Sequence, residues 1–220
     1  MGAIVEFLND ILVFFFNLTG SYGIAIIILT VIIRLVTWPL QNKQLTSAKA
    51  MQDLQPEIKK LQAKYKDDKE KLNQETMALW KKHKVNPAAS CLPLLIQMPV
   101  LWAMFQVLRE QVTITDTMFL GMDMTVSITD LRAMGALFAL TSVGYFILVL
   151  LSGLTTYLQQ KMMMSDKSQQ AMMIMMPLML LFFSLQFPAG LVMYWVVNNA
   201  LSIGQHVLIN KNVTKGAVTE

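Results

Sequence analysis

The sequence is poor in charge and in reactive side chains. Only 15% of the 220 residues are charged and 55% are hydrophobic, whereas an ordinary soluble domain carries about 25% charged residues. The single cysteine, Cys91, excludes an internal disulfide and a cysteine metal cluster, and two histidines are too few for a histidine-rich metal site. The sequence has no nucleophile–base pair, no paired catalytic carboxylates and no glycine-rich phosphate loop. We therefore predict an all-α, polytopic membrane protein that is not an enzyme and uses no cofactor or metal.

Long apolar runs predict five membrane-spanning helices, because about 20 residues cross a bilayer. Trp38-Pro39 is expected to end the first of them, since proline disfavours helix at the residue before it. Residues 1–21 hold a shorter apolar run with polar residues at helical spacing, which favours an amphipathic helix lying flat at the interface. The predicted spans are residues 22–40, 88–108, 133–157, 171–187 and 191–209.

The charge between these runs predicts their orientation. Residues 41–87 carry 11 lysines and 6 acidic residues, a net charge of +5, and residues 158–170 carry +1. Residues 109–132 carry two arginines and four acidic residues, a net charge of −2. Because basic loops stay in the cytoplasm, segments 41–87 and 158–170 and the tail 210–220 are expected inside, and residues 1–21 and 109–132 outside. The N-terminus is then outside and the C-terminus inside.

The basic segment 41–87 has apolar residues at helical spacing in two runs. Pro56 suits a helix start, Asp67 or Asp68 can cap a second helix, and Asn86-Pro87 is expected to end it. The pattern predicts a cytoplasmic hairpin of two antiparallel amphipathic helices. The alternative is a hairpin whose helices pack only on each other and bind no partner.

Arg34 lies in the middle of the first span, and none of the five spans contains an aspartate or glutamate. An arginine at that depth costs about 2.5 kcal/mol or more, so an unpaired one indicates function. Polar residues on other spans favour a wet cationic cavity that receives an anionic passenger. The alternative is that Arg34 reaches the headgroups by snorkelling. The residues predicted to line the cavity are Arg34, Thr30, Thr37, Gln97, Tyr194, Trp195 and Asn199.

Methionine is concentrated in the last third of the chain, where nine of the 18 lie between Met162 and Met193. Methionine is soft and recurs on surfaces that accept varied apolar partners. This favours an apolar face on the last three spans along which hydrophobic segments slide; the alternative is ordinary membrane filler. The residues predicted for this slide are Met172, Met173, Met176 and Leu191.

Five stretches together resemble the YidC family of membrane protein insertases, which includes the mitochondrial oxidase-assembly and thylakoid albino insertases. The resemblance covers about residues 22–209, and its motifs are LQPEIKKLQAKY, MALWKKHKVNP, CLPLLIQMPVLWAMF, GLTTYLQQKMM and FPAGLVMYWVVNN. It implies a five-span core with a hydrophilic groove open to cytoplasm and lipid but closed outside. The groove arginine of the family falls on Arg34, its aromatic pair on Tyr194 and Trp195, and its cytoplasmic hairpin on about residues 56–85.

The resemblance implies an insertase and membrane chaperone of the bacterial cell membrane. A short acidic or polar tail of a substrate would enter the groove while its apolar segment moves along spans 3 and 5 into lipid. Alternatives from other classes are a small anion channel or transporter and a passive assembly scaffold. The expected partners are nascent membrane proteins, the bilayer and, through the hairpin, the secretion channel, a targeting receptor and the ribosome; no nucleic acid is read directly. The hairpin residues predicted for these contacts are Lys59, Lys60, Lys64, Lys81 and Lys82.

The sequence departs from the family pattern in two places. It lacks the extra N-terminal span and the large periplasmic domain of Gram-negative members, which favours a minimal bacterial core. Cys91 lies at the start of span 2, so it cannot be the lipid-modified cysteine of many Gram-positive members. The short tail, with Lys211 and Lys215, predicts only weak ribosome binding.

Overall fold

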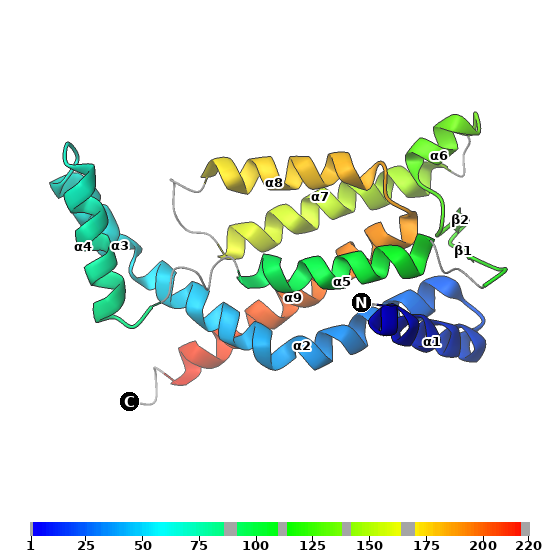
Figure 1. Cartoon of the computed structure of the whole chain (residues 1–220), viewed down its shortest axis with the longest axis horizontal. Helices are drawn as coiled ribbons and strands as arrows, with labels where there is room; N and C mark the ends of the chain where they lie inside the picture. The colour runs from blue at the N-terminus through cyan, green and yellow to red at the C-terminus, as the bar shows by residue number, and fades with distance from the viewer. Residues whose placement is uncertain (1, 86–91, 110–113, 138–141, 164–169, 217–220) are drawn as a thin grey trace.

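The computed structural model describes residues 2–85, 92–109, 114–137, 142–163 and 170–216, and most of them are helical (Figure 1). This agrees with the predicted all-α class. The elements are α1 (Gly2–Thr19), α2 (Tyr22–Asp53), α3 (Gln55–Lys64), α4 (Lys69–Lys82), α5 (Leu92–Arg109), β1 (Met118–Phe119), β2 (Met122–Asp123), α6 (Ile128–Ala133), α7 (Val143–Met163), α8 (Gln170–Ser184) and α9 (Ala189–Gly216).

Helix α9 is the centre of the bundle, because it packs against α2, α5 and α7, while α8 packs on α7 and α1 on α2 and α5. The long helices α2, α5, α7, α8 and α9 extend along the molecule in alternating directions (Figure 1). The α3–α4 pair projects at one end, where the C-terminus also lies. The β1–β2 ribbon and α6 lie at the opposite end.

The interior of the bundle changes character along its length. Around the β1–β2 end it is apolar, with buried side chains from the first turns of α2, α7 and α9 and the last turns of α5, such as Ile26, Val107, Tyr145 and Leu191. Farther along the same helices, toward α3–α4, the buried side chains are largely polar. These buried polar residues are Arg34, Gln44, Ser152, Thr156, Gln160, Asn198, Asn199, Ser202 and Gln205.

Helix α2 does not end at Trp38-Pro39, so that expectation was wrong. The helix continues through Pro39 to Asp53. Side-chain hydrogen bonds next to the proline support the continuous helix: the Thr37 hydroxyl donates to the carbonyl of Ile33 at 2.8 Å, and Gln41 Nε2 donates to Thr37 Oγ1 at 2.7 Å. Proline is tolerated inside membrane helices where neighbouring groups compensate for the missing backbone bond.

Helix α1 is longer than the apolar run within it. One face carries Val5, Leu8 and Leu12 into the core, whereas Phe7 and Phe14 are exposed.

Among the described residues, three helices are long and apolar enough to cross a membrane: Gly2–Thr19, Tyr22–Asp53 and the stretch Val143–Met162 of α7. The interfacial position of residues 1–21 and the count of five spans therefore stay predictions.

The segment 133–157 is not one continuous helix. Helix α6 ends at Ala133, Gly135 takes a left-handed φ of +72°, and α7 begins only at Val143 and continues to Met163. Left-handed backbone ends a helix and is readily adopted only by glycine. The connection 109–132 also contains β1, β2 and α6, which the sequence analysis did not predict.

Two antiparallel helices occupy the basic segment, joined by a short turn. Pro56 lies in the first turn of α3, and the Asp68 carboxylate caps α4 by accepting a hydrogen bond from the Lys71 backbone at 3.0 Å. Glu57 and His83 connect the helices at 4.0 Å. The predicted stop at Asn86-Pro87 and the predicted start of span 2 at residue 88 lie outside the described residues.

Candidate functional site

Arg34 is buried in the polar half of the bundle. Its side chain is 7% exposed, and its Nη2 donates to the hydroxyl of Ser202 on α9. Its Nε is buried without a hydrogen-bond partner, and no carboxylate of the described residues forms an ion pair with it. A buried guanidinium is therefore held by a neutral hydroxyl and not by a counter-ion, which disfavours the snorkelling alternative because that requires the charge to reach the headgroups.

A chain of hydrogen bonds leads away from Arg34 along the seam between α7 and α9. Ser202 accepts a second bond from Gln159 Nε2 at 3.0 Å. Gln159 Oε1 in turn accepts from the Asn199 amide nitrogen at 2.8 Å, and the Asn199 oxygen accepts from Trp195 Nε1 at 3.1 Å, in the amide orientation that satisfies both sides. The Trp195 indole also lies 2.9 Å from the Thr156 hydroxyl of α7. The predicted residues Arg34, Trp195 and Asn199 are thus joined in one network.

Tyr194 and Gln97 form a second contact across the bundle. Gln97 Nε2 on α5 donates to the Tyr194 hydroxyl on α9 at 2.9 Å, and Tyr194 is 1% exposed. Tyr194 directly precedes Trp195, a member of the Arg34 network, on α9. The pair therefore brings α5 to the same site.

Thr30 and Thr37 lie one turn before and after Arg34 but bond to their own helix. The Thr30 hydroxyl donates to Ile26 O at 2.7 Å, and the Thr37 hydroxyl donates to Ile33 O. Thr30 is buried and Thr37 is half-buried. Their hydroxyls remain able to accept a bond from a passing polar group.

Sequence reasoning missed the contribution of α7. Thr156 and Gln159 lie at helical spacing on an otherwise apolar helix, and this stripe was the signal that could have found them. The predicted span 3 ends at residue 157, which leaves Gln159 in the loop that follows.

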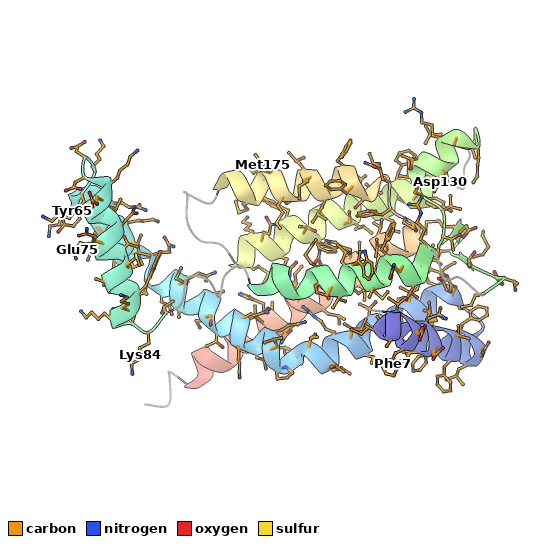
Figure 2. All side chains as sticks on the ribbon, viewed as in Figure 1. Phe7, Tyr65, Glu75, Lys84, Asp130 and Met175 are labelled. Atoms are coloured by element: carbon orange, nitrogen blue, oxygen red, sulfur yellow. The ribbon has the colours of Figure 1, made fainter. Side chains whose placement is uncertain are left out.

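The apolar surface lies on α7 and α8, and the predicted slide fits it only in part. Met173 and Met176 are half-buried, and Met176 Sδ accepts a bond from Gln160 at 2.9 Å. Leu191 is 1% exposed in the core, so its assignment to an accessible face was wrong; the side chain of Met172 lies outside the described residues. Met175 lies on the outer side of α8 (Figure 2). The most exposed apolar residues of the two helices are Ile147, Leu150, Leu154, Ile174, Met175, Leu178 and Phe182.

The predicted hairpin lysines are all on the surface. α4 buries none of its residues, and α3 buries only Ile58. The cation of Lys64 lies 4.9 Å from the centre of the Tyr65 ring, near the tip of the hairpin (Figure 2). The predicted lysines, all of them exposed, are Lys59, Lys60, Lys64, Lys81 and Lys82.

These features define a helical, multi-pass membrane protein with a buried cationic site. Residues 14–216 match the family model described as "60Kd inner membrane protein", so the chain belongs to that family, and the resemblance inferred from the motifs is confirmed. Together with the apolar helices, this membership assigns the chain to the bacterial inner membrane.

Named relatives are similar over most of this chain. It is 44% identical over 200 residues to "Membrane protein insertase YidC" of Syntrophus aciditrophicus, covering 90% of this chain and 34% of the relative. It is 42% identical over 203 residues to the protein of the same name from Geobacter sulfurreducens, covering 91% and 36%. The chain therefore spans about a third of the length of these relatives.

A solved structure shares the fold. It is titled "Active YidC insertase crystal structure with the first transmembrane domain resolved", and it superposes with a TM-score of 0.71 at 26% sequence identity. The match covers 92% of this chain and 45% of the other.

Proposed function

We propose that this chain is a membrane protein insertase and membrane chaperone that acts without catalysing a covalent reaction. Its family and the insertase activity for which its relatives are named support this class of activity. The observation that carries the proposal is Arg34, a buried cation in a polar half-bundle without a carboxylate partner among the described residues. Such a site suits a passenger that brings its own negative charge.

The mechanism follows from the two surfaces of the bundle. A short acidic or polar tail enters the polar half, where Arg34 and the hydroxyl and amide groups around it replace water. The apolar segment that follows moves over the exposed residues of α7 and α8 into lipid. Burial of that segment supplies the driving force, at about 25 cal/mol per Å², so no nucleotide is required.

The asymmetry of the bundle supports a groove that is closed at one end. Among the described residues, the half beside β1–β2 is packed mainly with apolar side chains, whereas the polar half extends toward the α3–α4 end. We assign α2, α5, α7, α8 and α9 to the five spans, with α3–α4 and the C-terminus in the cytoplasm and α1 and β1–β2 outside. The net charges of the connections and the alternating helix directions support this orientation.

Labelling of single cysteines tests this orientation. In a Cys91→Ser background, Lys60→Cys on α3 should react with a membrane-impermeant reagent only from the cytoplasmic side. Leu120→Cys, at the exposed tip between β1 and β2, should react only from outside. Reaction of both from one side would reject the orientation.

The proposed partners are nascent membrane proteins in the bilayer and, through the hairpin, the secretion channel, a targeting receptor and the ribosome. The exposed lysines of the hairpin, among them the five predicted ones, and the unburied α4 support a docking role for the hairpin. Replacing all five by glutamine should weaken binding of such partners but preserve insertion in a system lacking them. Unchanged binding would remove the hairpin lysines from the proposal.

Insertion into sealed liposomes tests the function itself. A small single-span protein with an acidic N-terminal tail is synthesised beside liposomes holding the purified chain, and protease protection of its tail is scored. Protection above that of empty liposomes is expected. Arg34→Ala should reduce protection of the acidic tail more than that of a tail with the acids replaced by amides. Equal loss with both tails would reject the electrostatic step, and no protection with the wild type would reject insertase activity in the isolated chain.

A further inference from the structure

The guanidinium of Arg34 presents two N–H groups along one side. Nε–H and the adjacent N–H of Nη2 point in nearly the same direction, which matches the two oxygens of a carboxylate. Ser202 Oγ takes the Nη2 position, while Nε is buried without a partner among the described residues. Of the two nitrogens that best fit a carboxylate, Nη2 is therefore bonded to a neutral hydroxyl and Nε has no partner among the described residues.

Ser202 is itself held in place by α7. Gln159 donates to it at 3.0 Å, and the Gln159 amide cannot rotate freely because its oxygen accepts from Asn199. The Ser202 oxygen thus accepts from two donors, one on α2 and one on α7. It satisfies a hydrogen-bond direction of Arg34 but supplies no negative charge.

We propose that Ser202 competes with substrate for Arg34: its hydroxyl accepts from Nη2 and is displaced when a substrate carboxylate binds side-on to Nε and Nη2. This inference rests on the proposed function and specifies which atoms of the site recognise the acidic tail. Hydrogen bonds between charged groups are about twice as strong as neutral ones, so the exchange favours a carboxylate over an amide or a hydroxyl. Ser202 keeps its bond from Gln159 and does not become unpaired.

Removing the Ser202 hydroxyl tests whether it competes with a substrate carboxylate for Arg34. In Ser202→Ala no neutral group occupies the Nη2 position, so an acidic tail gains affinity while its amide analogue does not. A typical hydrogen bond contributes enough to change affinity by about 3- to 10-fold. The concentration of acidic-tail substrate that gives half-maximal protection should fall by that factor, and that of the amide-tail substrate should stay unchanged. Ser202→Thr, which keeps the hydroxyl, should behave as the wild type.

A matched control removes another buried serine of the bundle. Ser152 of α7 is buried, and its hydroxyl bonds Ser184 of α8 at 3.0 Å and the backbone oxygen of Val149 at 2.7 Å. Its backbone oxygen accepts from Thr156, but alanine keeps that oxygen. Ser152→Ala should leave the ratio between acidic and amide tails unchanged. Binding of a fluorescent acidic-tail peptide to the protein in nanodiscs gives a second readout that does not depend on insertion. If Ser202→Ala does not fold, Ser202→Cys, a weak acceptor of similar shape, is scored in the same way.

The outcomes separate the two claims. A selective gain for acidic tails in Ser202→Ala supports the inference. An equal change for both tails, or no change, overturns it while leaving insertase activity intact. Failure of the wild-type chain to protect or bind an acidic tail instead overturns the proposed function.

Discussion

A single carboxylate organises the start of α6, in the connection between α5 and α7. Asp130 Oδ2 accepts from the Ser127 hydroxyl at 2.6 Å and from the Ser127 backbone N–H at 2.9 Å. The Asp130 backbone N–H donates back to the same hydroxyl at 3.1 Å, which completes a capping box. These bonds, the Ser127 hydroxyl first, hold the pKa of Asp130 below its ordinary value.

The lowered pKa of Asp130 predicts a pH-dependent contribution to stability. Because the folded pKa lies below the unfolded value of about 3.9, the contribution is present above that value and is lost as the pH falls through the folded pKa. Asp130→Ala should cost about 1 kcal/mol at pH 7, and the difference from wild type should shrink toward pH 3. Thermal unfolding in detergent and amide exchange of α6 measure this effect. Asp67→Ala, in the exposed α3–α4 turn, is the control; an undiminished difference at pH 3 would contradict the prediction.

At the residue scale, the sequence predicts which side chains are unusual but not which ones meet. The isolation of Arg34 and the polar stripe of α9 follow from spacing alone. The bonds from Arg34 and Gln159 to Ser202 do not, because spacing defines the faces of a helix and not its rotation against its neighbours. Leu191 shows the same limit: its apolar character suited a lipid-facing position as well as the core position that it occupies.

At the scale of elements, glycines let the connection between α5 and α7 pack closely on the ends of three helices. A Cβ on Gly23 of α2 would lie 2.1 Å from the Phe119 ring, and a Cβ on Gly144 of α7 would lie 2.7 Å from Met122 Sδ. Gly190 of α9 approaches the backbone oxygen of Met124, and its N–H donates to that oxygen at 2.8 Å. The ribbon therefore packs directly against helix backbones and covers the apolar end of the bundle.

Gly23→Ala should destabilise the protein, although alanine is the better helix former. Overpacking against Phe119 costs about 1–3 kcal/mol, more than the gain in helix propensity of about 1 kcal/mol. Gly204→Ala is the control, because no atom lies within 4 Å of its Cβ position on α9, and it should be neutral or stabilising. Thermal unfolding in detergent measures both.

A double-mutant cycle identifies the cause of that loss. Combining Gly23→Ala with Phe119→Ala should remove the clash. The double variant should therefore lose less stability than the sum of the losses of the two single variants. Strict additivity would show that the loss at Gly23 arises elsewhere.

Two regions were predictable from the sequence: the apolar run of α8 and the amphipathic pair α3–α4. The extents of α8 and of the α3–α4 pair are close to expectation, whereas β1–β2 carries no Asn-Gly signal: its turn places Leu120 at a φ of 51° and Gly121 at 77°. The start of α6 could have been predicted, because Ser127 and Asp130 have the spacing of a capping box. The passage of α2 through Pro39 was not predictable from local preference, because tertiary contacts and side-chain bonds override it.

At the scale of the whole molecule, one half of the bundle is packed with apolar side chains and the other with polar ones. The apolar half provides the stability, because its core residues come from α1, α2, α5, α7 and α9 together with the β1–β2 ribbon. In the proposed mechanism, the polar half is the site where a hydrophilic tail replaces existing hydrogen bonds instead of meeting hydrocarbon. Such a tail then has only the apolar half left to pass, and the thickness of the surrounding bilayer becomes decisive.

The short α8 predicts a thinner bilayer beside it. Its 15 residues extend about 22 Å, less than the hydrocarbon core of about 30 Å. Because an exposed apolar helix that is too short is accommodated by thinning, water should reach closer to its middle. Spin labels at Met175 and Phe182, exposed near the two ends of α8, should both report water contact in a Cys91→Ser background. A label at Leu150, exposed on the longer α7, should report less.

The thickness of the lipid should then control insertion. In liposomes of longer-chain lipids, the local thinning costs more, so protection of a polar tail should decrease while binding of the tail to the groove stays constant. Lengthening α8 by one apolar turn should shift the best lipid toward longer chains. The prediction fails if neither spin label on α8 reports water contact, or if the insertion yield does not depend on the length of the lipid acyl chains. Either result would show that the protein does not thin the membrane and that the polar half-bundle alone lowers the barrier.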